Sequence, residues 1–205
     1  MNDIITEINQ ELREDRGRAL WKKYGHYVIA FVLAVVMLVA GRQGLIAYQE
    51  NAQTSAANAY LEAVKADGND ALIALAGDGG EGYPMLAEFT AAARAAKAGD
   101  LAAAEAGYLK IAANNNIALL YQQAATLLSV MNGASSVDER IQRATPIANA
   151  DGPWQKLALE VLIGLAIEKG DIAGARKQLE TLRFTPNISA DLNQRLILID
   201  AALGE

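Results

Sequence analysis

The amino-acid sequence predicts an all-α fold, with a single N-terminal transmembrane helix followed by a solenoid of paired α-helices. Three observations support this prediction. An uncharged apolar run of 18 residues separates Lys23 from Arg42. From Tyr83 onward, helical segments rich in Ala and Leu follow one another, and none alternates with the period of a strand. Glycine-containing turns recur between these segments at intervals of 34 and 37 residues, as expected for a repeat protein.

The apolar run is long enough to cross a bilayer. Eighteen residues make about 27 Å of helix, close to the thickness of the hydrocarbon layer. The alternative is a buried core helix, which normally keeps a polar stripe, whereas every face of Val28–Gly41 is apolar or small. Basic residues flank the run, with Lys22 and Lys23 before it and Arg42 after it. We therefore expect a transmembrane helix over residues 24–46.

The distribution of basic residues predicts the orientation of this helix. Residues 1–23 contain five Lys or Arg, whereas residues 42–64 contain only Arg42. The positive-inside rule then leaves segment 1–23 in the cytoplasm and translocates the C-terminal part. A cleaved signal peptide is the alternative, but its charged leader would be unusually long and acidic, and no clear cleavage site follows the run. An uncleaved signal anchor of a single-pass type II protein fits better.

Segment 1–23 has apolar residues at near-helical spacing: Ile5, Ile8, Leu12, Leu20 and Trp21. This pattern predicts a short amphipathic helix that lies against the cytoplasmic membrane face or a partner. The same segment could equally serve only to set the topology. The sequence does not decide between these two interpretations.

Composition argues against an enzyme. The chain has no cysteine, and its only histidine is His26, at the predicted membrane boundary. Thiol chemistry, zinc sites and the usual nucleophile–base pairs are therefore largely excluded, and we expect no metal, cofactor or small-molecule substrate. Residues 43–205 contain 12 Lys or Arg and 19 Asp or Glu, a net charge of −7. Such a surface repels phosphates, so a nucleic-acid partner is not expected.

Residues 47–82 are predicted to be a linking helix and a flexible connector. A helical pattern runs over Leu45–Ala66, a break follows at Asp67–Asp70, and a short helical segment covers Ala71–Ala76. The glycine-rich stretch Gly77–Gly82 lacks the following Lys-Ser/Thr of a phosphate-binding loop and resembles a connector. The helical domain proper is then expected over residues 83–205.

Two turns in this domain have the same local sequence. Gly99-Asp100 and Gly170-Asp171 each separate two helical runs, and a small residue follows five positions after each glycine. A glycine that ends a helix favours the left-handed conformation, and the Asp can cap the next helix. Gly133 is the predicted turn glycine between them. Ala134 follows it in place of Asp, so the middle repeat departs from the pattern.

Repeats of about 34 residues with this turn, followed by Tyr108 or Leu179 in the second helix, resemble tetratricopeptide repeats. That resemblance implies a solenoid whose first helices line a concave, binding-competent face. Positions ten, six and three residues before each turn glycine would point there: Phe89, Ala93, Ala96, Gln123, Leu127, Val130, Glu160, Gly164 and Ile167. From these we predict a mostly apolar protein-binding groove that includes Phe89, Gln123, Leu127, Glu160 and Ile167. The alternative is that Phe89, Leu127 and Ile167 simply pack between helices.

The whole chain resembles a narrower family, the YfgM-type ancillary subunits of the Sec translocon, in the version found in alphaproteobacteria. The resemblance runs nearly end to end and depends on the order of short motifs. These are Glu11-Leu12-Arg13, Leu20-Trp21-Lys22-Lys23-Tyr24-Gly25, Gly152-Pro153-Trp154, Leu157-Ala158-Leu159-Glu160, Lys169-Gly170-Asp171 and Leu192 to Arg195. It implies a bacterial inner-membrane protein with a periplasmic C-terminal domain, and Sec translocon subunits and periplasmic chaperones as partners.

The sequence therefore predicts a non-enzymatic, membrane-anchored protein–protein interaction module. Tethering would raise its effective concentration at membrane-bound partners. The alternative is a scaffold of the envelope or of the division machinery that uses the same repeat domain.

Overall fold

The computed structural model describes residues 37–77 and 82–204. All the regular structure in these ranges is helical, and they contain no strand. The chain divides into two units, residues 1–55 and 56–205, each of which is described by itself. The predicted cytoplasmic segment 1–23, with Lys22 and Lys23, lies outside the described residues, as does His26.

Residues 37–65 are helical, and residues 37–55, including Arg42, are exposed along their whole length. Only the last part of the predicted transmembrane segment, residues 37–46, is described. Within the described ranges, no helix combines the length and the apolarity that crossing a bilayer requires. The span over residues 24–46 therefore stays a prediction.

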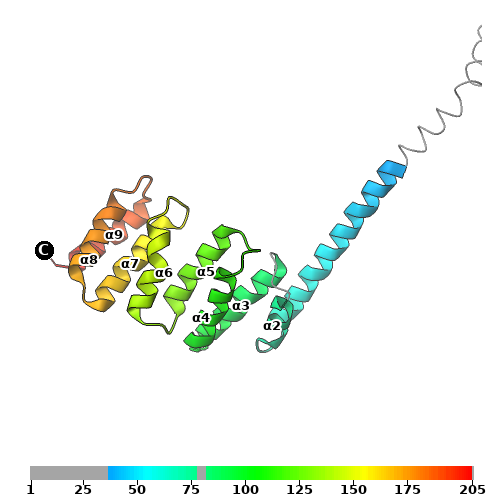
Figure 1. Cartoon of the computed structure of the whole chain (residues 1–205), viewed down its shortest axis with the longest axis horizontal. Coiled ribbons are helices and arrows are strands. Elements are labelled where there is room, and N and C mark those ends of the chain that lie inside the picture. The colour runs from blue at the N-terminus through cyan, green and yellow to red at the C-terminus, as the bar shows by residue number, and fades with distance from the viewer. Residues whose placement is uncertain (1–36, 78–81, 205) are drawn as a thin grey trace, which may run out of the picture. The chain divides into compact units, whose positions relative to one another are not determined.

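The second unit is a row of helices in which each helix packs on the next one in sequence (Figure 1). After the helical residues 56–65, it contains α2 (Asp70–Ala76), α3 (Tyr83–Lys97), α4 (Leu101–Ala112), α5 (Leu119–Asn132), α6 (Val137–Ala148), α7 (Gln155–Lys169), α8 (Ile172–Arg183) and α9 (Ala190–Ala202). Short turns join α3 to α4, α5 to α6, and α7 to α8. We call α3, α5 and α7 the A helices, and α4, α6 and α8 the B helices.

The solenoid begins earlier in the chain than residue 83. The Arg94 guanidinium donates to the carbonyl oxygens of Val64 and Gly68, and the Tyr60 and Thr90 hydroxyls lie 2.9 Å apart. Ala63 is buried with α2 and α3 in one small core. Residues 56–76, which the sequence assigns to a linker, thus form a partial helix pair packed on α3. Residues 78–81 of the predicted connector lie outside the described residues.

The first and third turns are built alike. Gly99 and Gly170 have φ of 84° and 78°, a conformation that side chains disfavour, and each ends an A helix. The Asp100 carboxylate then accepts the backbone N–H of Ala103 at 3.0 Å, and that of Asp171 accepts the N–H of Gly174 at 2.8 Å. These two carboxylates therefore begin the B helices α4 and α8.

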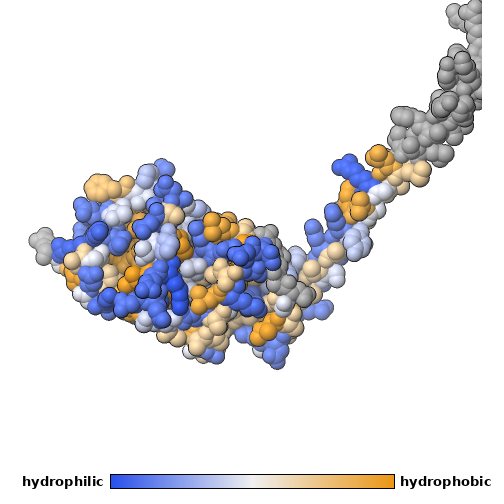
Figure 2. All heavy atoms as spheres, in the orientation of Figure 1, coloured by the Kyte–Doolittle hydropathy of each residue, from blue (hydrophilic) through white to orange (hydrophobic). Residues whose placement is uncertain are grey.

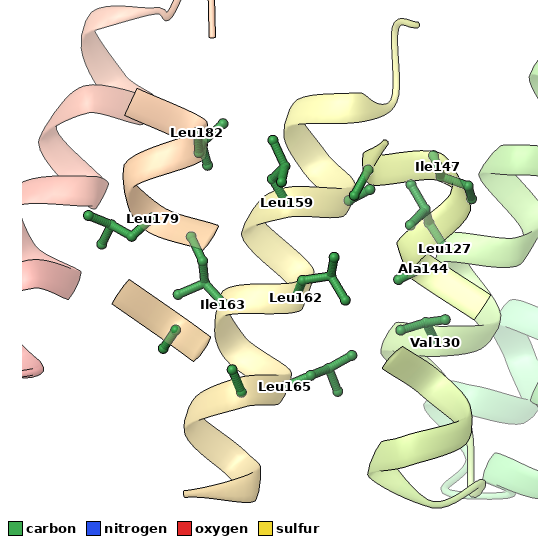
Figure 3. Packing of buried hydrophobic residues seen from close by; sticks show 14 of the residues in the cluster. Leu127, Val130, Ala144, Ile147, Leu159, Leu162, Ile163, Leu165, Leu179 and Leu182 are labelled. Atoms are coloured by element: carbon green, nitrogen blue, oxygen red, sulfur yellow. The ribbon is translucent and has the colours of Figure 1, made fainter. Parts of the chain in front are cut away.

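The main core lies between α5 and α9. Figure 3 shows Leu162 and Leu165 of α7 pointing toward α5 and α6, while Ile163 faces Leu179 of α8. Helix α7 thus buries side chains on two sides, as the inner helix of a solenoid must. Stability of the C-terminal half depends on this neighbour-to-neighbour packing.

Candidate protein-binding surface

Each A helix has a residue that is exposed directly after two buried ones. Each carries an adjacent pair of buried residues: Ala91 and Ala92 in α3, Ser129 and Val130 in α5, and Leu162 and Ile163 in α7. The residue after each pair is exposed, and these three residues are Ala93, Met131 and Gly164. We call these three exposed residues of α3, α5 and α7 the A face.

The predicted groove residue Leu127 does not lie on this face. Its side chain is 1% exposed and belongs to the main core beside Ile147 (Figure 3). Its burial fits the alternative interpretation, in which Leu127 packs between helices. The exposed large residue nearest the end of α5 is Met131, at 53% exposure.

The remaining predicted groove residues have different surroundings. Phe89 is half-buried and packs between α3 and α4, with its ring centroid 6.2 Å from that of Tyr108. Gln123 is half-buried on α5, and Ile167 is exposed on α7. The Glu160 carboxylate accepts two hydrogen bonds from Arg195 of α9, at 2.8 and 3.0 Å. Of the five residues, Ile167 presents the most open apolar surface, and Phe89 is mainly a packing residue.

Helix α5 contains no charged residue. It nevertheless exposes four large side chains: Leu119, Leu120, Tyr121 and Met131. The indole N–H of Trp154, at the start of α7, donates to the Leu120 carbonyl at 2.8 Å and fixes the first turn of α5 against its neighbour. A charge-free helix with exposed leucines at the centre of an acidic protein is a candidate contact surface for apolar partner side chains.

Helix α7 has open space at one exposed position. A Cβ atom added to Gly164 would meet no atom within 4 Å. Gly164 therefore leaves room on the surface of α7, and Ile167 lies about one turn further along the same helix. Glu160, one turn before Gly164, is paired with Arg195.

A buried carboxylate holds the middle turn in place. Glu105 of α4 is 7% exposed and accepts hydrogen bonds from the backbone N–H groups of Ala134 and Ser135, each at 2.9 Å, and from the Ser135 hydroxyl. Arg143 of α6 forms an ion pair with it. Burial opposes ionisation, but these hydrogen bonds outweigh burial and lower the pKa of Glu105 to about 2.

Gly133 allows the turn to pass close to the Glu105 carboxylate, and it does not adopt a left-handed conformation. Its φ is −94°, so the conformation predicted from Gly99 and Gly170 is absent. A Cβ there would collide with the Ser129 carbonyl oxygen and lie 2.9 Å from the Glu105 carboxyl carbon. Glycine is required at this position because the turn passes directly against Glu105.

The second B helix begins with a different cap. The Ser136 side chain accepts the backbone N–H of Glu139, and the Glu139 carboxylate accepts that of Ser136, which makes a capping box. The Ser-x-x-Glu signature of this cap is present in the sequence at Ser136 and Glu139. With it, the N-caps Asp100, Ser136 and Asp171 are spaced by 36 and 35 residues, a more regular repeat than the glycines indicate.

A family model described as a tetratricopeptide repeat-like domain matches residues 18–181. The chain belongs to the tetratricopeptide repeat-like domain family. No curated protein and no solved structure matches it. The helix pairs α3–α4, α5–α6 and α7–α8 are the tetratricopeptide-like repeats, and α9 lies beyond the matched residues.

Membership of the tetratricopeptide repeat-like family indicates a protein–protein interaction module, since such domains are generally non-catalytic, and it points to no enzymatic family. Among the described residues, no group of three or more His, Cys, Asp and Glu side chains could hold a metal ion. The A face and helix α5 are therefore the candidate functional site of this tetratricopeptide repeat-like domain.

Proposed function

We propose that this chain is a membrane-anchored interaction protein of the bacterial inner membrane, ancillary to the Sec translocon, which links it to periplasmic chaperones. The proposal joins the predicted signal anchor over residues 24–46 to the tetratricopeptide repeat-like domain. Its resemblance to YfgM-type proteins supplies the identity of the partners. The anchor would keep the domain beside membrane-bound partners and raise their effective concentration.

The observation that carries the interaction role is the charge-free, apolar surface of α5. A polypeptide leaving a translocon, or a chaperone that receives it, offers uncharged aliphatic side chains. These would pack on Met131 and enter the space beside Gly164, where burial of apolar surface gives about 25 cal/mol per Å². Unpaired charges on a partner would lose hydration there and gain no ion pair.

Site-specific photocrosslinking tests the proposal in intact membranes. A photoreactive amino acid at Met131 is expected to give adducts with translocon subunits or periplasmic chaperones. The matched control is the same amino acid at Ala173, which is exposed on the B helix α8 and should give few adducts. Adducts with envelope or division proteins alone would favour the scaffold function, and equal labelling from both positions would refute a binding role for the A face.

Topology is tested separately. A reporter that is active only outside the cytoplasm, fused after Glu205, should be active when expressed in bacteria. An inactive reporter, together with activity of a cytoplasmic reporter at the same position, would overturn the predicted orientation and with it the periplasmic partners.

A further inference from the structure

The turn between α5 and α6 contains the pair Asn132-Gly133, and no other asparagine of the chain is followed by glycine. In such a pair the backbone nitrogen of the glycine can attack the side-chain carbonyl carbon of the asparagine, because no Cβ shields the approach. The attack closes a five-membered succinimide ring and releases ammonia. Water then opens the ring to aspartate, or to isoaspartate, in which the main chain runs through the former side chain. The reaction consumes only water.

The attacking nitrogen is left without a hydrogen bond by the fold. The backbone N–H groups of the other two turn glycines are bonded, that of Gly99 to the Ala96 carbonyl at 3.0 Å and that of Gly170 to the Ile167 carbonyl at 2.9 Å. The N–H of Gly133 has no acceptor among the described residues. Gly133 is also half-exposed. Figure 2 shows hydrophilic side chains over α6, the helix that this turn leads into.

The packing of the turn keeps the reactive pair in place. A side chain at position 133 would lie 2.9 Å from the Glu105 carboxyl carbon, so a bulkier and less reactive residue does not fit there. The chain therefore has its one Asn-Gly pair at the turn that Glu105 holds.

Two features of the folded turn oppose the reaction. The side-chain amide nitrogen of Asn132 donates to the Leu128 carbonyl at 3.1 Å, which holds the side chain along α5. Glu105 accepts two backbone N–H groups of the turn, and its negative charge beside Gly133 disfavours the loss of the N–H proton that the attack requires. The reaction therefore needs the turn to open, and Glu105 opposes that opening.

We propose that Asn132 is a deamidation site whose rate is set by the contact of Glu105 with the turn. Either product gives α5 its only charge, at the C-terminal end of the helix, where the helix dipole disfavours an anion. Isoaspartate also adds an atom to the main chain, so the N–H groups of the turn no longer fit the Glu105 carboxylate. Deamidation thus weakens the attachment of α6 to α4.

Mass spectrometry of the proteolysed protein measures the aspartate and isoaspartate at position 132 after incubation of the full chain in detergent micelles at pH 8. Glu105→Gln should deamidate about tenfold faster or more, because a loss of about 1.4 kcal/mol in the stability of the closed turn raises its open population tenfold. The unmodified chain in urea should react fastest. Asn149 and Asn193, which precede Ala150 and Gln194, are internal references and should stay unchanged over the same period.

Two further variants separate the effect of the turn from a general loss of stability. Gly170→Ala strains the third repeat without touching Glu105 and should deamidate at the unmodified rate. Ser135→Ala removes one hydrogen bond of Glu105, keeps its charge and should give an intermediate rate. It replaces Glu105→Gln if the helical circular dichroism of that variant is lost.

Three results would overturn the proposal. The first is an absence of reaction at Asn132 in urea, and the second is an equal rate in the Glu105 and Ser135 variants and the unmodified chain. The third is an equal acceleration by Gly170→Ala, which would assign the reaction to global unfolding. None of these outcomes depends on the partners of the A face.

Discussion

Glu105 and Arg143, 38 residues apart in the chain, form an ion pair that joins the first repeat to the second. The same carboxylate accepts the N–H groups of the turn between α5 and α6. One side chain of α4 therefore fixes both the turn and the following helix. Glu105 therefore contributes to the orientation of α6 relative to α4, together with the packing of α5 on both helices.

Glu105→Gln should lower the free energy of unfolding by about 2–4 kcal/mol. The change leaves Arg143 without its counter-charge and weakens the hydrogen bonds of the turn. Urea unfolding of the full chain in detergent, followed by circular dichroism, measures the loss. Arg143→Met and the double variant complete the cycle, and a sum of single effects equal to the double effect would contradict direct coupling.

Stability should fall in acid because of the same carboxylate. The pKa of Glu105 is lowered from 4.5 to about 2 in the folded protein. A lowered pKa gives stability that is fully present above pH 4.5 and is lost as the pH falls from 4.5 toward 2, by about 3 kcal/mol in total. Urea midpoints between pH 6 and pH 2.5 measure it. Glu105→Gln should have a flatter profile, and parallel profiles would exclude Glu105 as the cause.

Replacing each of three glycines by alanine should change the free energy of unfolding by a different amount, because each glycine is found at its position for a different structural reason. Gly133→Ala brings a methyl group against the Ser129 carbonyl and Glu105, and should cost about 1–3 kcal/mol. Gly170→Ala meets no atom but keeps a positive φ, and should cost about 1–2 kcal/mol. Gly164→Ala has neither problem and should stabilise the helix by about 0.5–1 kcal/mol. The same stabilisation in all three would contradict this assignment.

Local signals in the sequence were sufficient to predict the turns of the first and third repeats. Gly99-Asp100 and Gly170-Asp171 combine a left-handed helix end with a side-chain cap, and both depend on neighbouring residues alone. The middle turn could not be predicted in the same way. Gly133 is required by contact with Glu105, which is distant in sequence, and such a contact leaves no periodic pattern.

The error at the candidate site concerns which residues of α5 are exposed. Leu127, predicted to line the groove, lies in the main core, whereas Met131 near the end of the same helix is exposed. The Ser136 capping box would have given the repeat boundary without the structure. The sequence pattern does not show which apolar residues of α5 are exposed. Leu127 in the core and Met131 on the surface are both apolar side chains of the same helix.

Met131→Glu should weaken partner binding on the A face without unfolding the domain. The residue is exposed, so a carboxylate there remains hydrated in the free protein and should change the free energy of unfolding by less than about 0.5 kcal/mol. In a complex the charge would be buried against apolar partner atoms, which should weaken binding about tenfold or more. Photocrosslinking from Leu120 in intact membranes measures the adduct yield in this background. Ala173→Glu on α8 is the matched control and should leave the adduct yield unchanged. Equal loss of adducts from both variants would show a general effect of added negative charge. An undiminished adduct yield in Met131→Glu would place the partner elsewhere.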